Sequence, residues 1–524
     1  MSTTIYYGAV INPVSLDSYE ALPRCLLAVG ATGCVEWLID DVEVSLVEDT
    51  MGQKGYVDNP VVHLKKTEFI MPGLIDTHTH APQFPNIGSG QQYELLDWLS
   101  NVTFPMEAKF ADLDFARDTY LSVVRRIINN GTTTCCYYGT LHLEATKLLA
   151  DIIKFYGQRA FVGKCSMDRN CPDDYVEPSA EASIDATESL IAHVRSPNFD
   201  HEQEPLVQST LTSLLAISSS SPPPFASLGK PIDATESLIA HVRSLNFDHE
   251  QEPLVQPTLT PRFAISCSSP LLASLGKLAS SDASLRIQTH ISENRSEIEF
   301  TKQLFPERTS YADVYDYFGL LRSNTILAHA VHLEPREMDL IAQRKAGISH
   351  CPTSNFNLSS GVAPVGEFLD RGIKVGLGTD VSGGYSPSIL NSVQTASIAA
   401  KVIAMQTAGS KPTSRKYGGR QLSVATLLYL ATLGGAEVCD LKERVGSFAA
   451  GKSFDALIIN ISDEGGNPCT ANAEEKKEKV ALKGMLERLL FCGDDRNIAK
   501  VFVQGKLIGG TVFEFPKFQT AIRT

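Results

Sequence analysis

The stretch "GLIDTHTH" (residues 73–80) places two histidines one residue apart at the end of an apolar run. Side chains two positions apart on a β-strand lie on the same face, so His78 and His80 can direct both imidazoles towards one point. In a chain with 12 histidines, a single H-x-H pair also arises by chance. The pair therefore indicates a metal site only if further ligands lie elsewhere in the sequence.

Three other polar residues also follow apolar runs. His290 ends "LRIQTH", His329 ends "NTILAH" and Asp380 ends "KVGLGTD". A parallel α/β barrel places its catalytic residues at the carboxyl ends of its strands. This shared position predicts that the three residues form one site together with His78 and His80.

The segments around these residues alternate helices and strands. "FARDTYLSVVRRIINNGTTTCCYY" (115–138) predicts a helix, a glycine stop and a strand, and "EFLDRGIKVGLGTD" (367–380) repeats this order. Recurrent αβ units from residue 71 to about 440 predict a parallel sheet or barrel in this part of the chain.

Both ends of the chain are instead rich in short strands. Such runs are "TIYYGAVI", "CVEWLI" and "VEVSLV" (42–47) near the start, and "FDALIIN", "VFVQGKLIGG" and "TVFEF" (511–515) near the end. We therefore expect one β domain, formed by residues 1–70 and 441–524, around a central domain of residues 71–440. The polar segment 463–484 is expected to be a mobile insertion.

The central region contains an internal repeat within residues 184–277, which indicates either a recent tandem duplication or an error in the gene model. "IDATESLIAHVRSPNFDHEQEPLVQSTLTSLLAIS" (184–218) returns, displaced by 48 residues, as "IDATESLIAHVRSLNFDHEQEPLVQPTLTPRFAIS" (232–266). A closed barrel has no place for an additional αβ unit, because its strand number, tilt and shear are linked. We expect the strand of the second copy, at about 254–265, to lie in the barrel, and much of 200–231 to be extruded.

Composition excludes several classes of partner. With 46 basic and 60 acidic residues, the net charge is −14, and no Lys/Arg-rich run is present, so nucleic acid is not expected to bind. No apolar stretch is long enough to cross a membrane, and the first residues do not resemble a signal peptide. The eleven scattered cysteines include no C-x-x-C pair, which indicates reduced thiols in the cytosol.

The residue types at the strand ends suit hydrolytic chemistry. Imidazole nitrogens with one carboxylate bind a divalent metal such as zinc at about 2.0–2.2 Å and leave a position for water. A metal lowers the pKa of bound water towards about 7, so that hydroxide forms at neutral pH. The pattern therefore predicts a metal-dependent hydrolase.

Six motifs resemble the amidohydrolase superfamily, and within it the enzymes that deaminate guanine: "MPGLIDTHTH", "TPRFAISCS", "THISEN", "LAHAVHL", "HCPTSNFNLSSG" and "GLGTDVSGG". The resemblance covers most of residues 71–440 apart from the duplicated segment, and extends to "LATLGGAEVCDL" and "LFCGDDRN". It implies an α/β fold, a (β/α)₈ TIM-like barrel with a small β-sandwich domain formed by both chain ends. It also implies one Zn²⁺ per subunit and a cytosolic homodimer that acts on a purine base.

The same resemblance assigns roles to individual residues. The implied zinc ligands are His78, His80, His290 and Asp380, and the implied catalytic residues are Glu293, His329 and Asp380. The implied guanine-binding residues are His80, Gln83, Arg262, Phe263, His290, Glu293 and Asp380. In the implied reaction, hydroxide attacks C2 of guanine, Glu293 protonates N3, Asp380 takes the proton of the water, and ammonia leaves to give xanthine.

Two other functions stay open at this point. A related amidohydrolase could act on another heterocycle, although the "TPRF" motif argues against it. A scaffold without activity is the second alternative, because the duplication could impair the fold, but the retained residues at all five strand ends argue against this loss. His350 of "HCPTSN" either lines the pocket or has a structural role.

Overall fold

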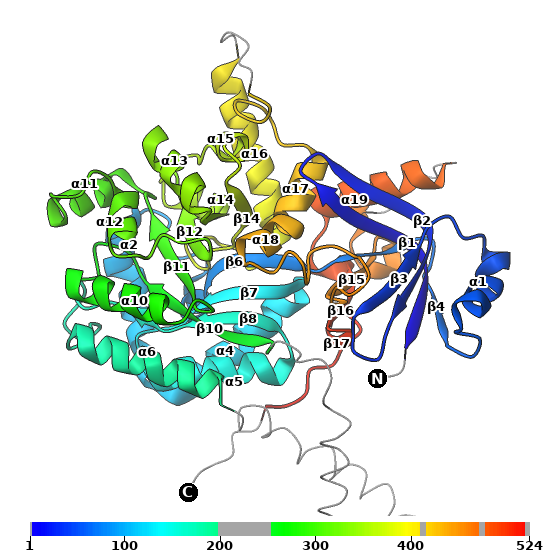
Figure 1. The fold of residues 1–524 in the computed structure, drawn as a ribbon, viewed down its shortest axis with the longest axis horizontal. Coiled ribbons are helices and arrows are strands. Elements are labelled where there is room, and N and C mark those ends of the chain that lie inside the picture. The colour runs from blue at the N-terminus through cyan, green and yellow to red at the C-terminus, as the bar shows by residue number, and fades with distance from the viewer. Residues whose placement is uncertain (1–2, 197–252, 409–414, 471–476, 519–524) are drawn as a thin grey trace, which may run out of the picture.

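Two β-sheets organise the computed structural model, which describes residues 3–196, 253–408, 415–470 and 477–518. Figure 1 shows a barrel surrounded by helices on the left and a second sheet, built from both chain ends, on the right. The first and last strands described lie in this second sheet, and the barrel strands come between them in the sequence.

The barrel contains eight strands that pair in parallel with their neighbours, in the order β14-β13-β12-β11-β10-β8-β7-β6. They are β6 (Leu74–His80), β7 (Thr132–Tyr138), β8 (Arg159–Gly163), β10 (Val255–Pro261), β11 (Arg286–Ile291), β12 (Thr325–His329), β13 (Gly347–His350) and β14 (Lys374–Leu377). A short strand, β9 (Cys165–Ser166), pairs with β10. Backbone hydrogen bonds from Asp380 to His78 (2.9 Å) and from His80 to Val381 (3.2 Å) connect the two ends of the sheet. The predicted (β/α)₈ barrel is confirmed.

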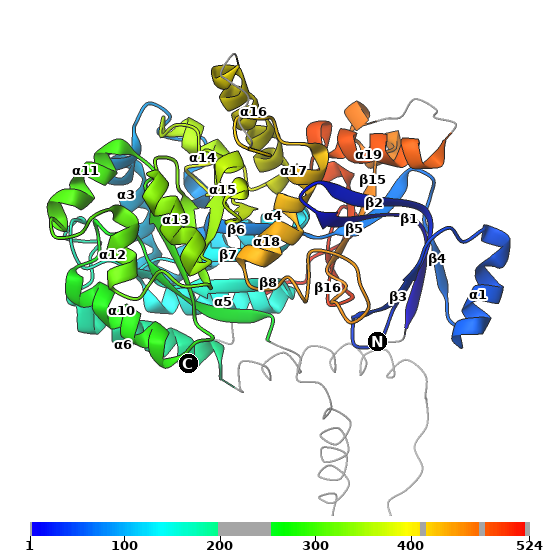
Figure 2. The same cartoon turned by 45° about the horizontal axis from the view of Figure 1, so that its top comes forward.

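Helices cover the outside of the barrel (Figure 2). Those that follow or flank its strands are α4 (Leu113–Asn129), α5 (Leu143–Tyr156), α6 (Ala180–Val194), α10 (Ser269–Ser281), α11 (Arg295–Leu304), α12 (Tyr311–Tyr317), α13 (Pro335–Arg344), α14 (Pro352–Asn357), α15 (Val365–Asp370), α16 (Ile389–Thr407), α17 (Val424–Ala431) and α18 (Leu433–Val438). The helix α4 illustrates their construction. Asp112 caps its first turn by accepting from the backbone of Asp114 and Phe115, and its apolar face packs into the core.

The segment between β6 and α4 is unusually long and folds over the carboxyl end of the barrel. It consists of short helical turns: η2 (Ala81–Asn86), α2 (Leu95–Trp98), η3 (Leu99–Thr103), α3 (Phe104–Glu107) and η4 (Ala108–Ala111). Their apolar residues Leu95, Trp98, Leu99 and Phe104 pack with Tyr175 and Phe263, which follow other barrel strands. This segment forms one wall of the site described below.

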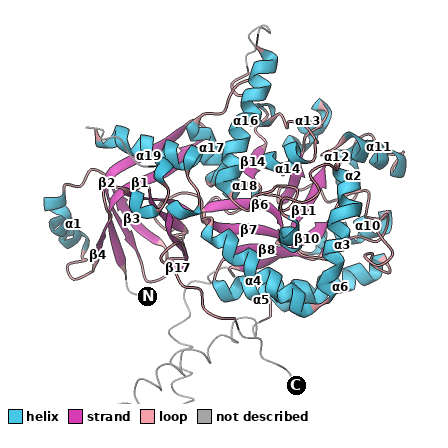
Figure 3. Cartoon of the chain, turned by 180° about the vertical axis from the view of Figure 1, so that it is seen from behind, coloured by secondary structure: helices cyan, strands magenta, loops and turns pink. Residues whose placement is uncertain are grey.

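The second sheet joins the chain ends and lies beside the barrel (Figure 3). Its strand order is β17-β16-β15-β5-β1-β2-β3, and β4 pairs with β1. Its strands are β1 (Thr4–Ser15), β2 (Ser18–Val29), β3 (Val35–Ile39), β4 (Val61–His63), β5 (Glu68–Pro72), β15 (Ala456–Asn460), β16 (Ile498–Val503) and β17 (Lys506–Gly509). Strand β5 pairs with β1 on one side and with β15 on the other, so it connects the two ends of the chain.

The sheet of the chain ends meets the barrel at Gly73, the single residue between β5 and β6. A Cβ atom at this position would lie 2.0 Å from Oγ1 and 2.2 Å from Cγ2 of Thr133, so only glycine fits. Nearby, the buried Arg159 of β8 donates to Asp455 beside β15, with an Nε–Oδ2 distance of 2.8 Å. These contacts fix the start of "LIDTHTH" relative to both sheets.

The duplicated segment contributes one αβ unit to the described barrel. The helix α6 contains the helical residues of the first copy, and β10 is the strand of the second copy, as predicted. The helix packs against the strand, and β10 pairs with β8 and β11. The expectation that 200–231 is extruded concerns residues outside the described ranges.

Three local expectations need correction. Residues 42–47 are not a strand: η1 (Val44–Leu46) leads into α1 (Val47–Lys54), which buries Val47 and Met51 and ends at the left-handed Gly55. Residues 511–515 form no strand. Part of the expected insertion at 463–484 is ordered, because η5 (Asp463–Gly465), η6 (Pro468–Thr470) and α19 (Glu478–Cys492) lie there. Among the described residues, no helix is both long and apolar enough to span a membrane.

Candidate metal centre and active site

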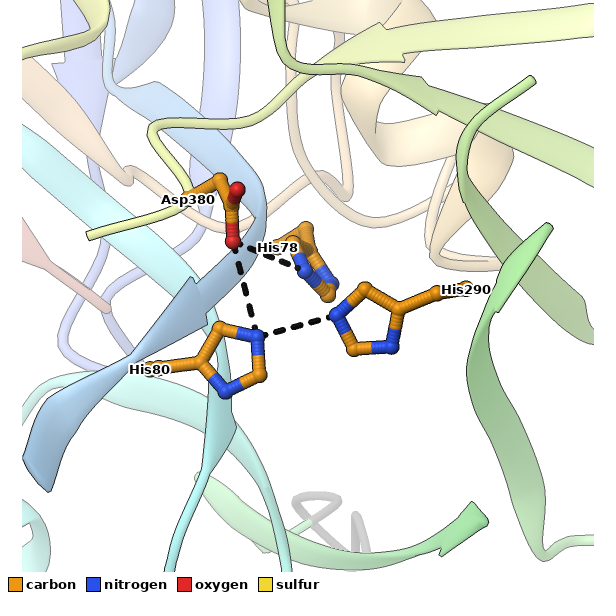
Figure 4. A group of neighbouring side chains, drawn as sticks. All are labelled: His78, His80, His290 and Asp380. Carbon is orange, nitrogen blue, oxygen red and sulfur yellow. Dashed lines mark hydrogen bonds and ion pairs between the residues drawn. The ribbon is translucent and has the colours of Figure 1, made fainter. Parts of the chain in front are cut away.

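The four residues predicted as metal ligands converge at the carboxyl end of the barrel (Figure 4). One potential ligand atom from each of His78, His80, His290 and Asp380 lies within 4.8 Å of all the others, and all four residues are buried. The two Nε2 atoms of His80 and His290 are 3.0 Å apart, and Oδ1 of Asp380 is 3.2 Å from Nε2 of His78. The cluster has the composition of a site for a divalent metal ion.

Neighbouring acceptors fix the orientation of the rings. Nδ1 of His78 donates to Oε1 of Gln288 at 2.8 Å, and Nδ1 of His290 donates to the backbone oxygen of Arg262 at 2.5 Å. Because these acceptors have no proton to give, each Nδ1 carries the hydrogen and each Nε2 presents a lone pair to the centre. Nε2 of His78 is buried and has no hydrogen-bond partner among the described residues. A metal ion at the centre would bind its lone pair.

The protonation states also suit a metal. Burial and the neighbouring His78 hold the pKa values of His80 and His290 well below the usual range of histidine. Burial alone would raise the pKa of Asp380, but the neighbouring imidazoles of His78 and His329 hold this pKa well below its usual range. Neutral imidazoles and an ionised carboxylate are the forms that bind metal ions, so this donor set fits zinc.

Asp380 and His329 owe their positions to unusual backbone conformations. Both lie at positive φ, 47° for Asp380 and 72° for His329, where the chain leaves the barrel. Buried Asp76 supports the first of these turns, because its carboxylate accepts from the backbone nitrogens of Thr379 (3.0 Å) and His78 (3.2 Å). Strained residues at strand ends are common in catalytic sites, where the surrounding structure maintains them.

Glu293 and His329 lie beside the metal cluster. Oε2 of Glu293 is 3.3 Å from Nε2 of His329, and Oδ2 of Asp380 is 3.7 Å from the same nitrogen. The burial of Glu293 raises its pKa to about 7. Burial alone would lower the pKa of His329, but Glu293 and Asp380 raise it. A carboxyl group with a pKa near neutrality can both accept and donate a proton.

A pocket of about 380 Å³ opens next to these groups. The sequence-predicted residues that line it are His80, Gln83, Arg262, Phe263, His290, Glu293, His329 and Asp380. Leu95, Trp98 and Leu99 of the segment between β6 and α4 close it from the other side. A pocket with apolar walls and a few convergent polar groups is typical of a binding site for a small molecule.

A model of the amidohydrolase family matches residues 69–508. The chain belongs to the amidohydrolase family. The match extends from β5 to β17 and therefore includes the whole barrel and part of the sheet of the chain ends.

Individual relatives match this amidohydrolase over nearly the whole of its length. A probable guanine deaminase of Schizosaccharomyces pombe is 42% identical over 507 residues, which cover 97% of this chain and 83% of the relative. The guanine deaminase of Homo sapiens is 34% identical over 506 residues, 96% of each chain. The crystal structure of guanine deaminase from C. acetobutylicum, with bound guanine in the active site, is 31% identical, with a TM-score of 0.76, and the match covers 97% of this chain and 100% of the other.

Sequence reasoning about this amidohydrolase missed one buried residue of the site, Glu107. It is the last residue of α3 and hydrogen-bonds with both Arg262 and Gln83. No motif marks Glu107, because only the folding of the segment after β6 brings it to the pocket. Two residues that support the site from behind, Gln288 and Asp76, were also missed. Both lie inside quoted motifs, but the motifs gave roles only to the residues at the strand ends.

His350 lies outside the pocket of the amidohydrolase. It is buried at the end of β13 and lines a different cavity, together with residues of α15 and α16. Burial and the charge of His329 lower its pKa to about 3, so the ring stays neutral. The position of His350 therefore favours the structural alternative.

Proposed function

We propose that this amidohydrolase hydrolyses guanine to xanthine and ammonia, as a step of purine catabolism, with one zinc ion per subunit. One observation carries the proposal: the cluster of His78, His80, His290 and Asp380 faces a pocket that also contains Arg262 and Phe263. The named relatives support the choice of guanine, because full-length matches at 34–42% identity are guanine deaminases.

The pocket offers complementary groups for a 6-oxopurine. Phe263 provides an aromatic surface for the ring, and the guanidinium of Arg262 supplies fixed donors for the O6 acceptor. The amino group of adenine cannot accept hydrogen bonds from these donors, so we expect adenine to bind poorly. Arg262 and Phe263 are almost fully buried, so water screens their contacts with a ligand less than at an exposed surface.

The proposed reaction gives each of three residues beside the metal cluster a role in proton transfer. A zinc ion held by the four ligands would act as a Lewis acid and lower the pKa of water. His329 would hold the attacking water, Asp380 would take its proton, and Glu293 would carry a proton to N3 of the ring as the new C2–O bond forms. Asp380 would then return its proton to the amino group, which leaves as ammonia when the C2–N bond breaks. The proton of the new C2 hydroxyl would return to Glu293, which leaves the C2 carbonyl of xanthine.

The assembly and compartment are also proposals. We propose a cytosolic homodimer; the free state of all eleven cysteines supports a reducing compartment. Light scattering of the purified chain tests the dimer, and cell fractionation tests the compartment. A monomer, or a chain found in a secreted fraction, would contradict the respective part.

The decisive experiment combines metal analysis with substrate comparison. The purified full chain is assayed with guanine, adenine, cytosine and triazines, and its zinc content is measured before and after treatment with a chelator. We expect one zinc per chain, xanthine formation from guanine only, loss of activity on chelation and recovery with zinc. A metal-free, inert chain would support the scaffold alternative, and faster turnover of another heterocycle would assign a different substrate.

A further inference from the structure

Glu107 connects three segments around the pocket and has no role in the function proposed above. Its side chain is fully buried, and both carboxylate oxygens accept hydrogen bonds. Oε2 accepts from Nη1 of Arg262 at 2.6 Å and from the hydroxyl of Tyr175 at 2.8 Å. Oε1 accepts from Nη2 of Arg262 at 3.1 Å and from Nε2 of Gln83 at 2.8 Å. The two partners Arg262 and Gln83 line the pocket, and Glu107 lies behind them.

The first consequence concerns the amide of Gln83. A glutamine amide can present either its NH₂ group or its oxygen to a ligand. Here a carboxylate, which only accepts, fixes the NH₂ group, and the amide oxygen accepts from the backbone nitrogen of Ser382 at 3.1 Å. The amide therefore cannot rotate to offer its oxygen to an amino group, and only its remaining N–H is free for a ligand.

The second consequence concerns the charge of Arg262. Its guanidinium is 3% exposed, forms a two-point ion pair with Glu107 and lies 5.2 Å from the ring of Phe104. Two of its five N–H donors face Glu107, and Nη1 also lies 3.8 Å from Sγ of Cys165 and 4.0 Å from Sδ of Met167. The N–H of Nε and the second N–H of Nη2 are left for a ligand. Because the pair is buried, the negative charge of Glu107 offsets the arginine at short range and in a poorly screened environment.

We propose that Glu107 is a specificity-determining positioning residue for the recognition wall, the part of the pocket formed by Gln83 and Arg262. It lets this wall offer only hydrogen-bond donors to a ligand, and its charge neutralises that of Arg262. Such a wall selects a neutral 6-oxopurine over its 6-amino analogue and over an oxypurine anion. The inference rests on the proposed function for the orientation of the purine ring. A buried ion pair with a purely structural role would stabilise the fold without affecting this selection.

The variant Glu107→Gln tests the proposal because it keeps the shape and removes the charge. Gln83 can then rotate, and the charge of Arg262 is no longer offset. We expect the KM for guanine to rise about tenfold or more, with a much smaller change in kcat, because an orienting contact is lost before the reaction begins. The preference for guanine over 2,6-diaminopurine, measured as the ratio of kcat/KM, should fall by at least about tenfold.

Binding of xanthine supplies a readout that needs no turnover. Titration calorimetry at a pH where xanthine is neutral, and at an alkaline pH where it has lost a ring proton, compares the two forms. In Glu107→Gln, the affinity for the anionic form relative to the neutral form should rise about tenfold, since Arg262 then acts as an unpaired cation. The double variant Glu107→Gln/Arg262→Gln should lose this gain.

A matched control separates charge selection from stability. Arg159 and Asp455 form another buried arginine–carboxylate pair, with side chains 3% and 1% exposed, where the barrel meets the sheet of the chain ends. Asp455→Asn should reduce stability in the same way as Glu107→Gln, but change neither the substrate ratio nor the pH dependence of xanthine binding. If Glu107→Gln does not fold, Tyr175→Phe removes one contact to Glu107 and keeps both charges. It should raise the KM for guanine by a few-fold without strengthening binding of the anion.

The outcomes distinguish this inference from the proposed function. If the wild type forms xanthine while folded Glu107→Gln keeps its substrate ratio and its xanthine binding, the role of Glu107 is overturned and guanine hydrolysis stands. An unchanged KM in Tyr175→Phe would likewise overturn it where Glu107→Gln is unfolded. If the wild type is inert with guanine but Glu107→Gln binds the xanthine anion more tightly, the assigned activity fails and the role of Glu107 stands.

Discussion

At the scale of single residues, the site depends on neighbours that hold the reactive groups in one protonation state and one orientation. Gln288, the backbone of Arg262 and Asn355 each accept a hydrogen bond from Nδ1 of a central histidine. Each contact fixes a tautomer, and with it the nitrogen that faces the pocket. The chemistry of the site therefore involves more residues than the ligands and the proton carriers.

The variant Glu293→Gln tests proton transfer. Glutamine preserves the size of the side chain beside His329 but cannot carry a proton, so turnover of guanine should fall by about 10²–10⁴ while zinc content stays unchanged. Steady-state kinetics and metal analysis measure the two effects. Glu299→Gln, on the exposed surface of α11, serves as the control and should leave both unchanged. Turnover close to that of the wild type would remove Glu293 from the mechanism.

The variant Gln288→Leu tests the orientation of His78. Leucine removes the acceptor 2.8 Å from Nδ1, so the ring is held less firmly and zinc affinity should fall about 10- to 100-fold. Competition with a chromophoric chelator measures the affinity. Gln256→Leu is the matched control, because Gln256 bonds Arg286 near the amino ends of β10 and β11, away from the cluster. Equal zinc affinities in both variants would show that Gln288 has no such role.

The residues at the strand ends could be predicted from the sequence. Most of the residues that support them from behind could not. His78, His80, His290 and Asp380 follow apolar runs, and the parallel barrel brings the ends of such runs together. Glu107 follows no strand, and its partners Arg262 and Tyr175 are distant in sequence. Its role depends on how the segment after β6 folds over the barrel, which local patterns do not specify.

At the scale of elements, alternation of helix and strand was the reliable signal. The runs that became α4, β7, β11 and β12 combine a strong periodicity with caps or glycine stops. Residues 42–47 were misassigned because a short β-branched run does not distinguish a strand from the start of a helix. There, the acidic residues Glu48 and Asp49 favour the first turn of α1.

The variant Gly73→Ala tests the joint between the two sheets. The added Cβ would lie 2.0 Å from Oγ1 of Thr133, so β6 must shift, and the free energy of unfolding should fall by about 1–3 kcal/mol. Because β6 carries His78 and His80, zinc affinity should fall too. Gly52→Ala is the control: this helical glycine of α1 has open space around it, and alanine there should stabilise by about 0.5–1 kcal/mol. Denaturant unfolding measures both, and an unaffected Gly73→Ala would disprove the steric constraint.

At the scale of the whole molecule, the barrel accommodates a duplicated αβ unit without a ninth parallel unit among the described residues. It combines the helix α6 of the first copy with the strand β10 of the second, and these two elements pack on each other. The choice of strand has a functional consequence, because the second copy carries Arg262 and Phe263 where the first has Leu214 and Leu215. The predicted guanine-binding wall thus requires the second strand.

Two deletions of 48 residues each test this choice. Removal of residues 197–244 joins the helix of the first copy to the strand of the second through a single linker, and retains Arg262 and Phe263. We expect this variant to keep zinc binding and guanine turnover, because every described barrel strand remains. Removal of residues 219–266 instead places the first-copy residues that correspond to β10 in front of α10, with Leu214 in place of Arg262.

The second deletion should fail for a specific reason. Without Arg262, the buried carboxylate of Glu107 loses its partner, which costs about 3–5 kcal/mol, and O6 of guanine loses its donors. Thermal unfolding, zinc content and guanine kinetics of both variants measure the difference. Equal activity in the two deletions would show that the strands are interchangeable and that Arg262 does not recognise guanine. Loss of folding in the first deletion would show that the barrel needs residues 197–244.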